Sequence, residues 1–233
     1  MAYVELKDVR KTYYMGENEI HAADGVTLSI EKGDFCVIVG PSGAGKTTVL
    51  NILGGMDTCD SGVVMLDGQD IAKMNSRQLT LYRRHDVGFV FQFYNLVQNL
   101  TALENVELAG EICEHPLDAK ETLIQVGLGD RINNFPAQLS GGEQQRVSIA
   151  RAIAKNPKIL LCDEPTGALD FATGQSVLAL LHRLCRETGK TVIIITHNQE
   201  RTKMADRVFG IRNGKVVYEA ENDDPTPVEE LVW

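Results

Sequence analysis

The segment Gly-Pro-Ser-Gly-Ala-Gly-Lys-Thr at positions 40–47 constrains the fold of this chain more than any other. A short apolar run at 35–39 precedes it and predicts a strand, and a helical run at 48–53 follows it. A strand, a Gly-rich loop and a helix in this order are typical of a Walker A phosphate-binding loop. A dinucleotide-binding fingerprint fits less well, because the glycines are spaced Gly-x-x-Gly-x-Gly. The segment therefore predicts an α/β fold with a phosphate site.

Individual residues of this loop suit that task. Gly40, Gly43 and Gly45 let the backbone turn so that successive N–H groups point at phosphate oxygens, and the helix N-terminus adds partial positive charge. We expect Lys46 to reach the β and γ phosphates and Thr47 to bind magnesium.

A second phosphate-binding candidate is Leu-Ser-Gly-Gly-Glu-Gln-Gln-Arg at 139–146, which opens another helical run. Ser140 and Glu143 have the spacing of a capping box, which is a purely structural device. Capping leaves Gly141 and Gly142 unexplained, since glycine is a poor helix former but permits a ligand to approach the backbone. We therefore expect an anion to bind at this helix N-terminus as well.

Two adjacent acids end the apolar run at 158–162, which predicts a buried parallel strand. Ligands of open α/β sheets bind at the carboxyl ends of strands. If the strand continues through both acids, their side chains point to opposite sides and take different roles. Asp163 suits the magnesium shell, and Glu164 suits the activation of water. Taken alone, an Asp-Glu pair is equally consistent with a charged strand edge.

Two further strands end in polar side chains that fit the same edge. The run at 191–195 leads to His197, which can hydrogen-bond a γ phosphate, and the run at 87–91 leads to Gln92, whose amide can touch magnesium or water. Without their neighbours, both residues would be read as ordinary loop residues.

The ordered set of motifs resembles the nucleotide-binding subunit of an ABC transporter over essentially the whole chain. It comprises an aromatic near the start, a Walker A loop, a Q-loop glutamine, an LSGGEQ signature, a Walker B strand, a D-loop at 167–170 and an H-loop histidine. Within that family it is most similar to the branch of macrolide exporters, lipoprotein-release ATPases and the cell-division ATPase. Gly167 stands where many relatives outside the branch have serine.

The resemblance implies a full set of site residues. Glu164, His197 and Gln92 are expected to be catalytic. Thr47 and Gln92 are expected to bind magnesium directly, and Asp163 through water. Tyr13 stacks on adenine, with Tyr14 as the competing candidate. Asp170 belongs to the D-loop. The remaining ATP contacts are Gly40, Pro41, Ser42, Gly43, Ala44, Gly45, Lys46, Thr47 and Thr48 in one chain, and Ser140, Gly141, Gly142 and Glu143 from the second chain.

The resemblance also implies partners. Two copies associate head to tail around ATP and magnesium, and the dimer energises a separate integral-membrane permease whose cargo the sequence does not encode. An aromatic and apolar cluster, Phe93, Tyr94 and Leu96, is either permease contact or core. A soluble ABC protein acting on ribosomes or DNA fits less well, because one ATPase unit is present and 46–139 lacks sustained heptads. A small-molecule kinase leaves the signature unexplained.

Composition places limits on location and chemistry. No stretch approaches the ~20 apolar residues of a membrane span, so we expect a cytoplasmic protein held at the inner face of the cell membrane by the permease. A net charge of −9 makes nucleic acid an unattractive partner. The five cysteines form no Cys-x-x-Cys pair and are expected to be reduced. His182 and Cys185 share a helical face, which favours core packing over a metal site.

The predicted architecture is a P-loop NTPase with a mainly parallel core sheet, a flanking antiparallel β subdomain and an inserted helical subdomain. One ATPase domain covers 1–220, with the helical subdomain at about 93–140. The acidic tail, 221–233, is expected to be flexible, although its apolar end at 231–233 offers a docking segment.

Overall fold

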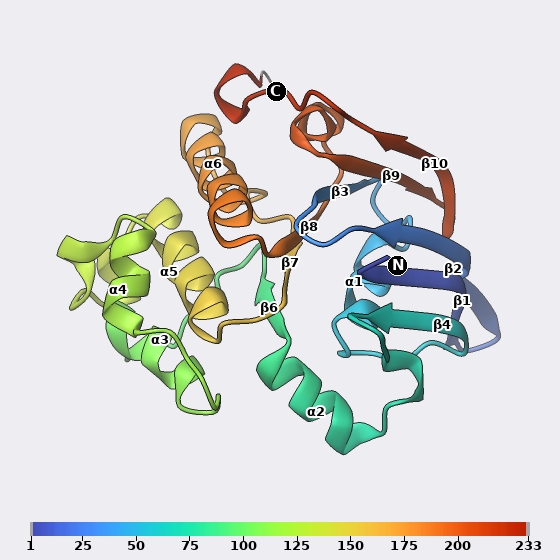
Figure 1. The fold of residues 1–233 in the computed structure, drawn as a ribbon, viewed down its shortest axis with the longest axis horizontal. Coiled ribbons are helices and arrows are strands. Elements are labelled where there is room, and N and C mark those ends of the chain that lie inside the picture. The colour runs from blue at the N-terminus through green and yellow to red at the C-terminus, as the bar shows by residue number, and fades with distance from the viewer. Residues whose placement is uncertain (1, 232–233) are drawn as a thin grey trace.

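The computed structural model describes residues 2–231, and its strands form two sheets with helix α1 (Lys46–Leu53) between them (Figure 1). The six-stranded sheet has the order β10 (Lys215–Glu221), β9 (Arg207–Arg212), β3 (Phe35–Val39), β8 (Thr191–Thr196), β7 (Ile159–Asp163) and β6 (Val87–Val90). All neighbours in it are parallel except β10, which pairs antiparallel with β9. The predicted parallel core is therefore confirmed.

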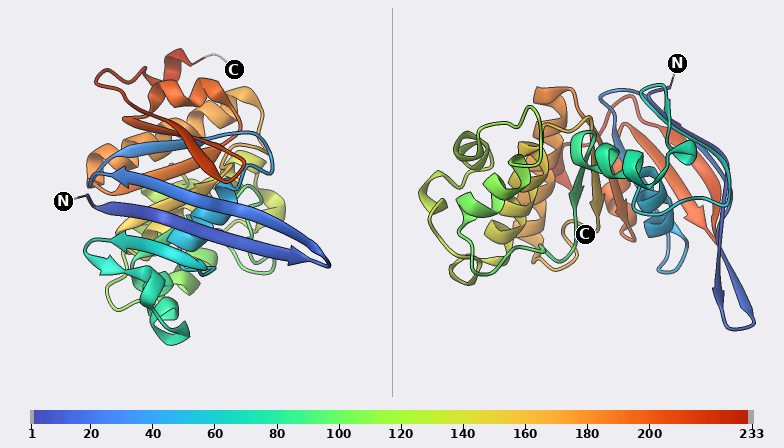
Figure 2. Two further views of the ribbon diagram at one scale, coloured as in Figure 1. Left: turned by 90° about the vertical axis from the view of Figure 1, so that its right-hand side faces the viewer. Right: turned by 90° about the horizontal axis from the view of Figure 1, so that it is seen from below.

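The second sheet is antiparallel and belongs to the N-terminal part of the chain. Its order is β2 (Asn18–Ile30), β1 (Val4–Met15), β4 (Ser61–Leu66) and β5 (Gln69–Asp70). The hairpin of β1 and β2 extends beyond the rest of the sheet (Figure 2). Alternating apolar residues of these strands are buried against α1. This burial explains the strand-like alternation of apolar and polar residues in this part of the sequence.

Helices cover the other face of the six-stranded sheet. They are α5 (Gly141–Ala154) and α6 (Phe171–Thr188), with α3 (Ala102–Gly110) and α4 (Ala119–Gln125) packed on α5 to form a separate lobe (Figure 1). Helices α3 and α4 lie within the range 93–140 expected for a helical subdomain, whereas α5, which packs with them, lies beyond it. The other helical segments are α2 (Ser76–His85), η1 (Ile71–Lys73), η2 (Gly129–Arg131), η3 (Pro136–Gln138), η4 (Gln199–Met204) and η5 (Val228–Glu230).

The aromatic and apolar cluster of the helical lobe divides between core and surface. Leu96 is buried and Tyr94 packs against the same core, whereas Phe93 is 72% exposed. The structure thus assigns Leu96 to the core and leaves Phe93 available at the surface.

The acidic tail packs against α6, where flexibility was expected. Val228 and Leu231 are buried in the core under α6, and the Gln175 side chain donates hydrogen bonds to the carbonyls of Val228 and Glu229. Two apolar side chains within an acidic run thus hold the segment in place. Residues 232 and 233 lie outside the described part of the chain.

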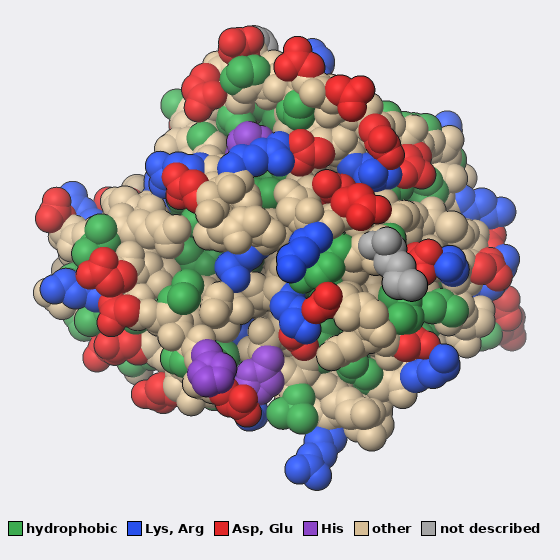
Figure 3. All heavy atoms as spheres, in the orientation of Figure 1, with side chains coloured by type: hydrophobic (Ala, Val, Ile, Leu, Met, Phe, Trp, Pro, Cys, Tyr) green, Lys and Arg blue, Asp and Glu red, His purple; other side chains and the backbone are tan. Residues whose placement is uncertain are grey.

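The surface carries charges of both signs. On the face seen in Figure 3, acidic and basic side chains are interspersed. Within residues 2–231, no helix is long and apolar enough to cross a membrane.

Candidate nucleotide site

A cavity of about 710 Å³ lies over the Walker A loop. Three parts of the chain enclose it: the loop itself, the β1–β2 hairpin and the turn between β9 and β10. The lining residues are Tyr13, Ile20, His21, Ala22, Asp24, Gly43, Ala44, Gly45, Lys46, Thr47, Thr48, Asn213, Gly214 and Lys215. The phosphate-binding loop and the aromatic from the N-terminal strand, which are far apart in the sequence, thus meet in one cavity.

The loop needs glycine at two points for steric reasons. Gly45 has a φ of 100°, and a Cβ there would lie 2.0 Å from the carbonyl oxygen of Ala22. A Cβ on Gly40 would lie 2.1 Å from the carbonyl oxygen of Ile211. Because both obstacles are backbone atoms, a side chain at either position requires the loop to move away from the flanking strands.

Lys46 is held by its own loop. Its Nζ donates to the carbonyl oxygens of Gly40 at 2.7 Å and Pro41 at 2.9 Å, and the residue is buried. Burial lowers the pKa of Lys46, while the carboxylates of Glu164 and Asp163 act in the opposite direction. The ammonium group is thus a pre-positioned cation at the edge of the cavity.

The carboxyl end of β7 brings its acids to the same edge. The Thr47 hydroxyl lies 3.4 Å from Oδ2 of Asp163. Burial raises the pKa of Asp163, and the neighbouring charge of Glu164 raises it further. The strand does not continue through both acids, because Glu164 has a φ of 45°. Glu164 follows the strand in a left-handed conformation, so the expected strand alternation does not apply to this pair.

The Glu164 carboxylate is hydrogen-bonded to residues at the carboxyl end of β8. Its Oε1 accepts from the backbone N–H of His197 at 2.8 Å and lies 2.7 Å from His197 Nδ1. Its Oε2 accepts from the Thr196 hydroxyl at 3.2 Å. The structure therefore brings together the proposed base and the H-loop histidine, as the sequence predicts for two neighbouring strand ends.

Gln92, which follows β6, lies next to the D-loop. A Cβ on Gly167 would lie 2.9 Å from Nε2 of Gln92. Gly167 therefore leaves room for this amide, which gives the departure from serine a local reason.

Tyr13, rather than Tyr14, faces the cavity. The Tyr13 hydroxyl donates to Oδ2 of Asp57 at 2.6 Å, and the Lys11 ammonium lies 5.3 Å from its ring centroid. Burial and the bond to Asp57 raise the pKa of Tyr13. Tyr14 points away and is 72% exposed. The geometry favours Tyr13 as the aromatic that meets a base.

The signature segment begins α5 and forms the predicted capping box. The Ser140 hydroxyl accepts from the N–H of Glu143, and the Glu143 carboxylate accepts from the N–H of Ser140 at 2.8 Å. Arg131 lies 3.1 Å from the Glu143 carboxylate. Ser140 is exposed at the start of the helix and Gly141 is partly exposed, whereas Gly142 is buried.

The double glycine has a packing role that sequence reasoning missed. A Cβ on Gly142 would lie 2.2 Å from Cγ2 of Thr173, and one on Gly141 would lie 2.8 Å from the Tyr94 hydroxyl. Asp170 sits beside this contact and caps α6 by accepting from the N–H of Thr173 at 3.1 Å. The signature and the D-loop are therefore packed against each other within one chain.

Two other features were not identified from the sequence. Gln145 is buried, and its amide donates to the carbonyls of Phe91 and Pro165, which joins the signature helix to the loops after β6 and β7. Arg201 is buried beside Glu164, with its Nη1 3.6 Å from Oε2. The second glutamine of the signature was a visible signal for Gln145, whereas a cation four residues after His197 gives no pattern that predicts burial.

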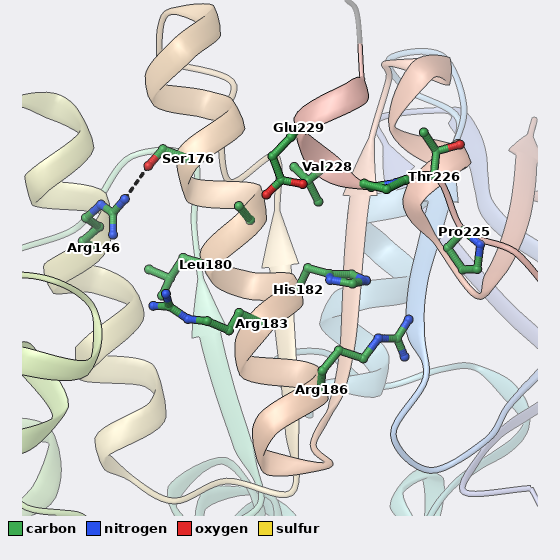
Figure 4. Close-up of a pocket in the computed structure, with 12 residues that line it drawn as sticks. Arg146, Ser176, Leu180, His182, Arg183, Arg186, Pro225, Thr226, Val228 and Glu229 are labelled. Atoms are coloured by element: carbon green, nitrogen blue, oxygen red, sulfur yellow. Dashed lines mark hydrogen bonds between the residues drawn. The ribbon is translucent and has the colours of Figure 1, made fainter.

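A second cavity, of about 580 Å³, lies between α5, α6 and the acidic tail (Figure 4). The cavity is lined by Arg146, His182, Arg183 and Arg186, and by none of the predicted ATP contacts.

Cys185, which lies on α6 together with His182, is buried and donates to the carbonyl of Gly33. Among residues 2–231, no three His, Cys, Asp or Glu side chains are arranged to hold a metal ion.

Comparison with known proteins gives consistent matches. A family model described as ABC transporter matches residues 23–167. An uncharacterized ABC transporter ATP-binding protein of Thermotoga maritima is 47% identical over 91% of this chain and 93% of that protein. The macrolide export ATP-binding/permease protein MacB of Escherichia coli K12 is 47% identical over 92% of this chain, which spans 34% of MacB.

A solved structure has the same fold. It is a dimeric structure of a post-hydrolysis state of the ATP-binding cassette MJ0796 bound to ADP and Pi. It superposes with a TM-score of 0.85 at 43% identity, and covers 94% of this chain and 98% of that one.

Proposed function

The chain belongs to the family of ABC transporter ATP-binding proteins, and on this basis we propose that it hydrolyses ATP within a head-to-tail dimer that drives a membrane permease. In this dimer, each ATP contacts the Walker A loop of one copy and the signature segment of the other. The dimeric cassette MJ0796, which was bound to ADP and Pi, supports both the reaction and the pairing.

One observation carries the proposal. The residues that line the Walker A cavity come from 13–24, 43–48 and 213–215, and the signature residues 139–146 are not among the described residues that line it. The start of the signature helix nevertheless has Ser140 exposed and Gly141 partly exposed, and a helix N-terminus attracts anions. A second phosphate-binding element outside the cavity of its own chain suits the cavity of a second copy.

The residues around the cavity suit phosphoryl transfer to water. Lys46 supplies positive charge, and Tyr13 supplies a ring face for adenine. Glu164 is the general base that takes a proton from the attacking water, and His197 orients its carboxylate. Because little covalent chemistry is required, positioning and charge stabilisation provide most of the rate enhancement.

The oxygen donors at the edge of the cavity fit magnesium. The Thr47 hydroxyl and the Asp163 carboxylate lie 3.4 Å apart, and both are hard oxygen ligands. Burial and the charge of Glu164 raise the pKa of Asp163, which a nearby cation would counteract. Thr47, Asp163 and Gln92 would hold the ion. Magnesium bound there would neutralise charge that develops on the phosphate oxygens.

The permease is proposed to be a separate chain, and it holds the cassette at the inner face of the cell membrane. The name of MacB includes both ATP binding and a permease. The Thermotoga relative, which is similar in length to this chain, is named only as an ATP-binding protein. Phe93 is an exposed aromatic on the helical lobe and suits contact with such a partner.

Co-purification tests the partner. Tagged Glu164→Gln protein is recovered from detergent-solubilised native membranes with ATP and magnesium, and bound proteins are identified by mass spectrometry. We expect an integral-membrane permease, and Phe93→Ser should weaken its recovery without lowering ATP binding. Recovery with ribosomal or DNA-bound proteins alone would overturn the permease proposal and leave the ATPase chemistry intact.

A further inference from the structure

Arg201 is a buried cation next to the proposed catalytic base. It lies on η4, the short helical segment that directly follows the H-loop. Its side chain is 7% exposed, and its Nη1 lies 2.9 Å from the Thr196 hydroxyl oxygen and 3.6 Å from Oε2 of Glu164. The sequence motifs of the site do not include this residue.

A guanidinium at this depth needs a counter-charge. Transfer of an ion from water into a protein interior is unfavourable unless the ion is paired and hydrogen-bonded. Burial lowers the pKa of Arg201, and the charge of Glu164 acts against that effect. Glu164 is therefore a counter-ion of Arg201, and its side chain is itself only 15% exposed.

Arg201 also acts on Glu164 through Thr196. The Thr196 hydroxyl oxygen accepts from Nη1 of Arg201 and from the backbone N–H of Asn198. A hydroxyl that accepts from two donors directs its own proton elsewhere, and Oε2 of Glu164 is 3.2 Å away. Arg201 thus places a positive charge near Oε2 and orients the Thr196 hydroxyl that donates to Oε2. The other oxygen, Oε1, is hydrogen-bonded by His197.

We propose that Arg201 is a positioning residue for ATP hydrolysis, which holds the Glu164 carboxylate in the orientation from which it activates water. The inference rests on the proposed role of Glu164 as general base. Arg201 does not line the nucleotide cavity as described. Its loss should therefore change the rate of hydrolysis and leave the binding of ATP almost unaltered.

A double-mutant cycle tests this inference. ATP turnover and KM are measured for Arg201→Met and Arg201→Lys, each with Glu164 intact and with Glu164→Gln. With Glu164 intact, Arg201→Met should lower kcat by roughly tenfold to a hundredfold, the scale for a misplaced catalytic group, with KM changed by less than about twofold. Arg201→Lys keeps the charge and should recover part of the rate. In Glu164→Gln, Arg201→Met should change kcat by less than about twofold.

A control separates positioning from structural support. Arg207 has a side chain 15% exposed and pairs with Asp34 and Glu219 away from Glu164. Arg207→Met should lower the thermal midpoint as Arg201→Met does, with kcat of the folded enzyme unchanged.

Three results would overturn the proposal: an equal proportional loss of kcat in both Glu164 backgrounds, a rise in KM with kcat unchanged, or no rate advantage of Arg201→Lys over Arg201→Met. If Arg201→Met does not fold, the Arg201→Lys and Thr196→Val variants complete the same cycle. Full turnover in Glu164→Gln alone would instead refute the role of Glu164 as base.

Discussion

Nδ1 of His197 lies 2.7 Å from Oε1 of Glu164, and the backbone N–H of His197 donates to the same oxygen at 2.8 Å. An ionised carboxylate can only accept hydrogen bonds, so Nδ1 of His197 is the donor in this contact. The carboxylate and the imidazole therefore form one unit at the adjoining ends of β7 and β8, and the first prediction concerns that unit.

Glu164→Gln should lower ATP turnover by roughly two to four orders of magnitude, the range for loss of a positioned base. The amide still accepts from the His197 N–H through its oxygen, so the site should keep its geometry and bind ATP with unchanged affinity. Phosphate release and equilibrium ATP binding are the two measurements. Wild-type turnover in this variant would refute the assignment.

Tyr13 lines the nucleotide cavity and its neighbour Tyr14 does not, so substitutions of the two can be compared directly. Loss of a base–aromatic stack costs about 1 to 3 kcal/mol, so Tyr13→Ala should weaken ATP binding by roughly 5-fold to 150-fold. Tyr13→Phe keeps the ring, loses the bond to Asp57, and should stay within about fivefold of wild type. Tyr14→Ala should change ATP affinity by less than about twofold, because Tyr14 is 72% exposed. The reverse order would assign the stack to Tyr14.

Ser140 has a structural role in its own chain and a proposed ligand role in the second copy, and two substitutions separate these. Ser140→Ala removes the cap of α5 and should destabilise the protein by about 0.5 to 2 kcal/mol. Ser140→Asp keeps a capping oxygen but introduces negative charge facing phosphate, so it should abolish ATP turnover while retaining most of the stability.

Thr101→Asp provides the control for that comparison, since Thr101 forms the equivalent capping box on α3. It should leave both the thermal midpoint and ATP turnover close to wild type. If Ser140→Asp remained an active ATPase, the signature helix would have only its structural role.

The cysteines should differ in their rate of alkylation. Cys36, Cys162 and Cys185 are buried, and burial raises the pKa of each thiol, in Cys185 to about 11. Cys59 and Cys113 are partly exposed. In native protein at pH 8, iodoacetamide should label Cys59 and Cys113 first, and all five only after unfolding. Peptide mass spectrometry reads out the order; early labelling of Cys162 would contradict the buried position of β7.

The sequence predicted the parts of the site that follow the strand ends. Lys46, Asp163 and His197 lie at or just beyond the carboxyl ends of β3, β7 and β8, and parallel strands bring these ends to one edge whatever the details of packing. The apolar runs also located the strands themselves. The bounds of β3 match its apolar run, and those of β6, β7 and β8 differ from their runs by one residue, because hydrogen bonding rather than apolar character determines where a strand ends.

The features that were missed depend on contacts between distant residues. Gly142 has a packing reason only because Thr173 approaches it from α6. The end of β7 at Asp163 comes with a left-handed Glu164 that no alternation rule predicts. Leu231 belongs to the apolar end at 231–233 that was offered as a docking segment, but the burial of Val228 beside it under α6 was not expected. None of these contacts leaves a periodic signal in the sequence.

The most direct test of the account is the mass of the protein in solution with and without nucleotide, measured by sedimentation on Glu164→Gln. We predict a monomer without ATP, a dimer with ATP and magnesium, and no dimer when Ser140→Asp is added to the same chain. A mass that does not depend on ATP, or an ATP-dependent dimer that tolerates Ser140→Asp, would contradict the claim that two copies share each ATP.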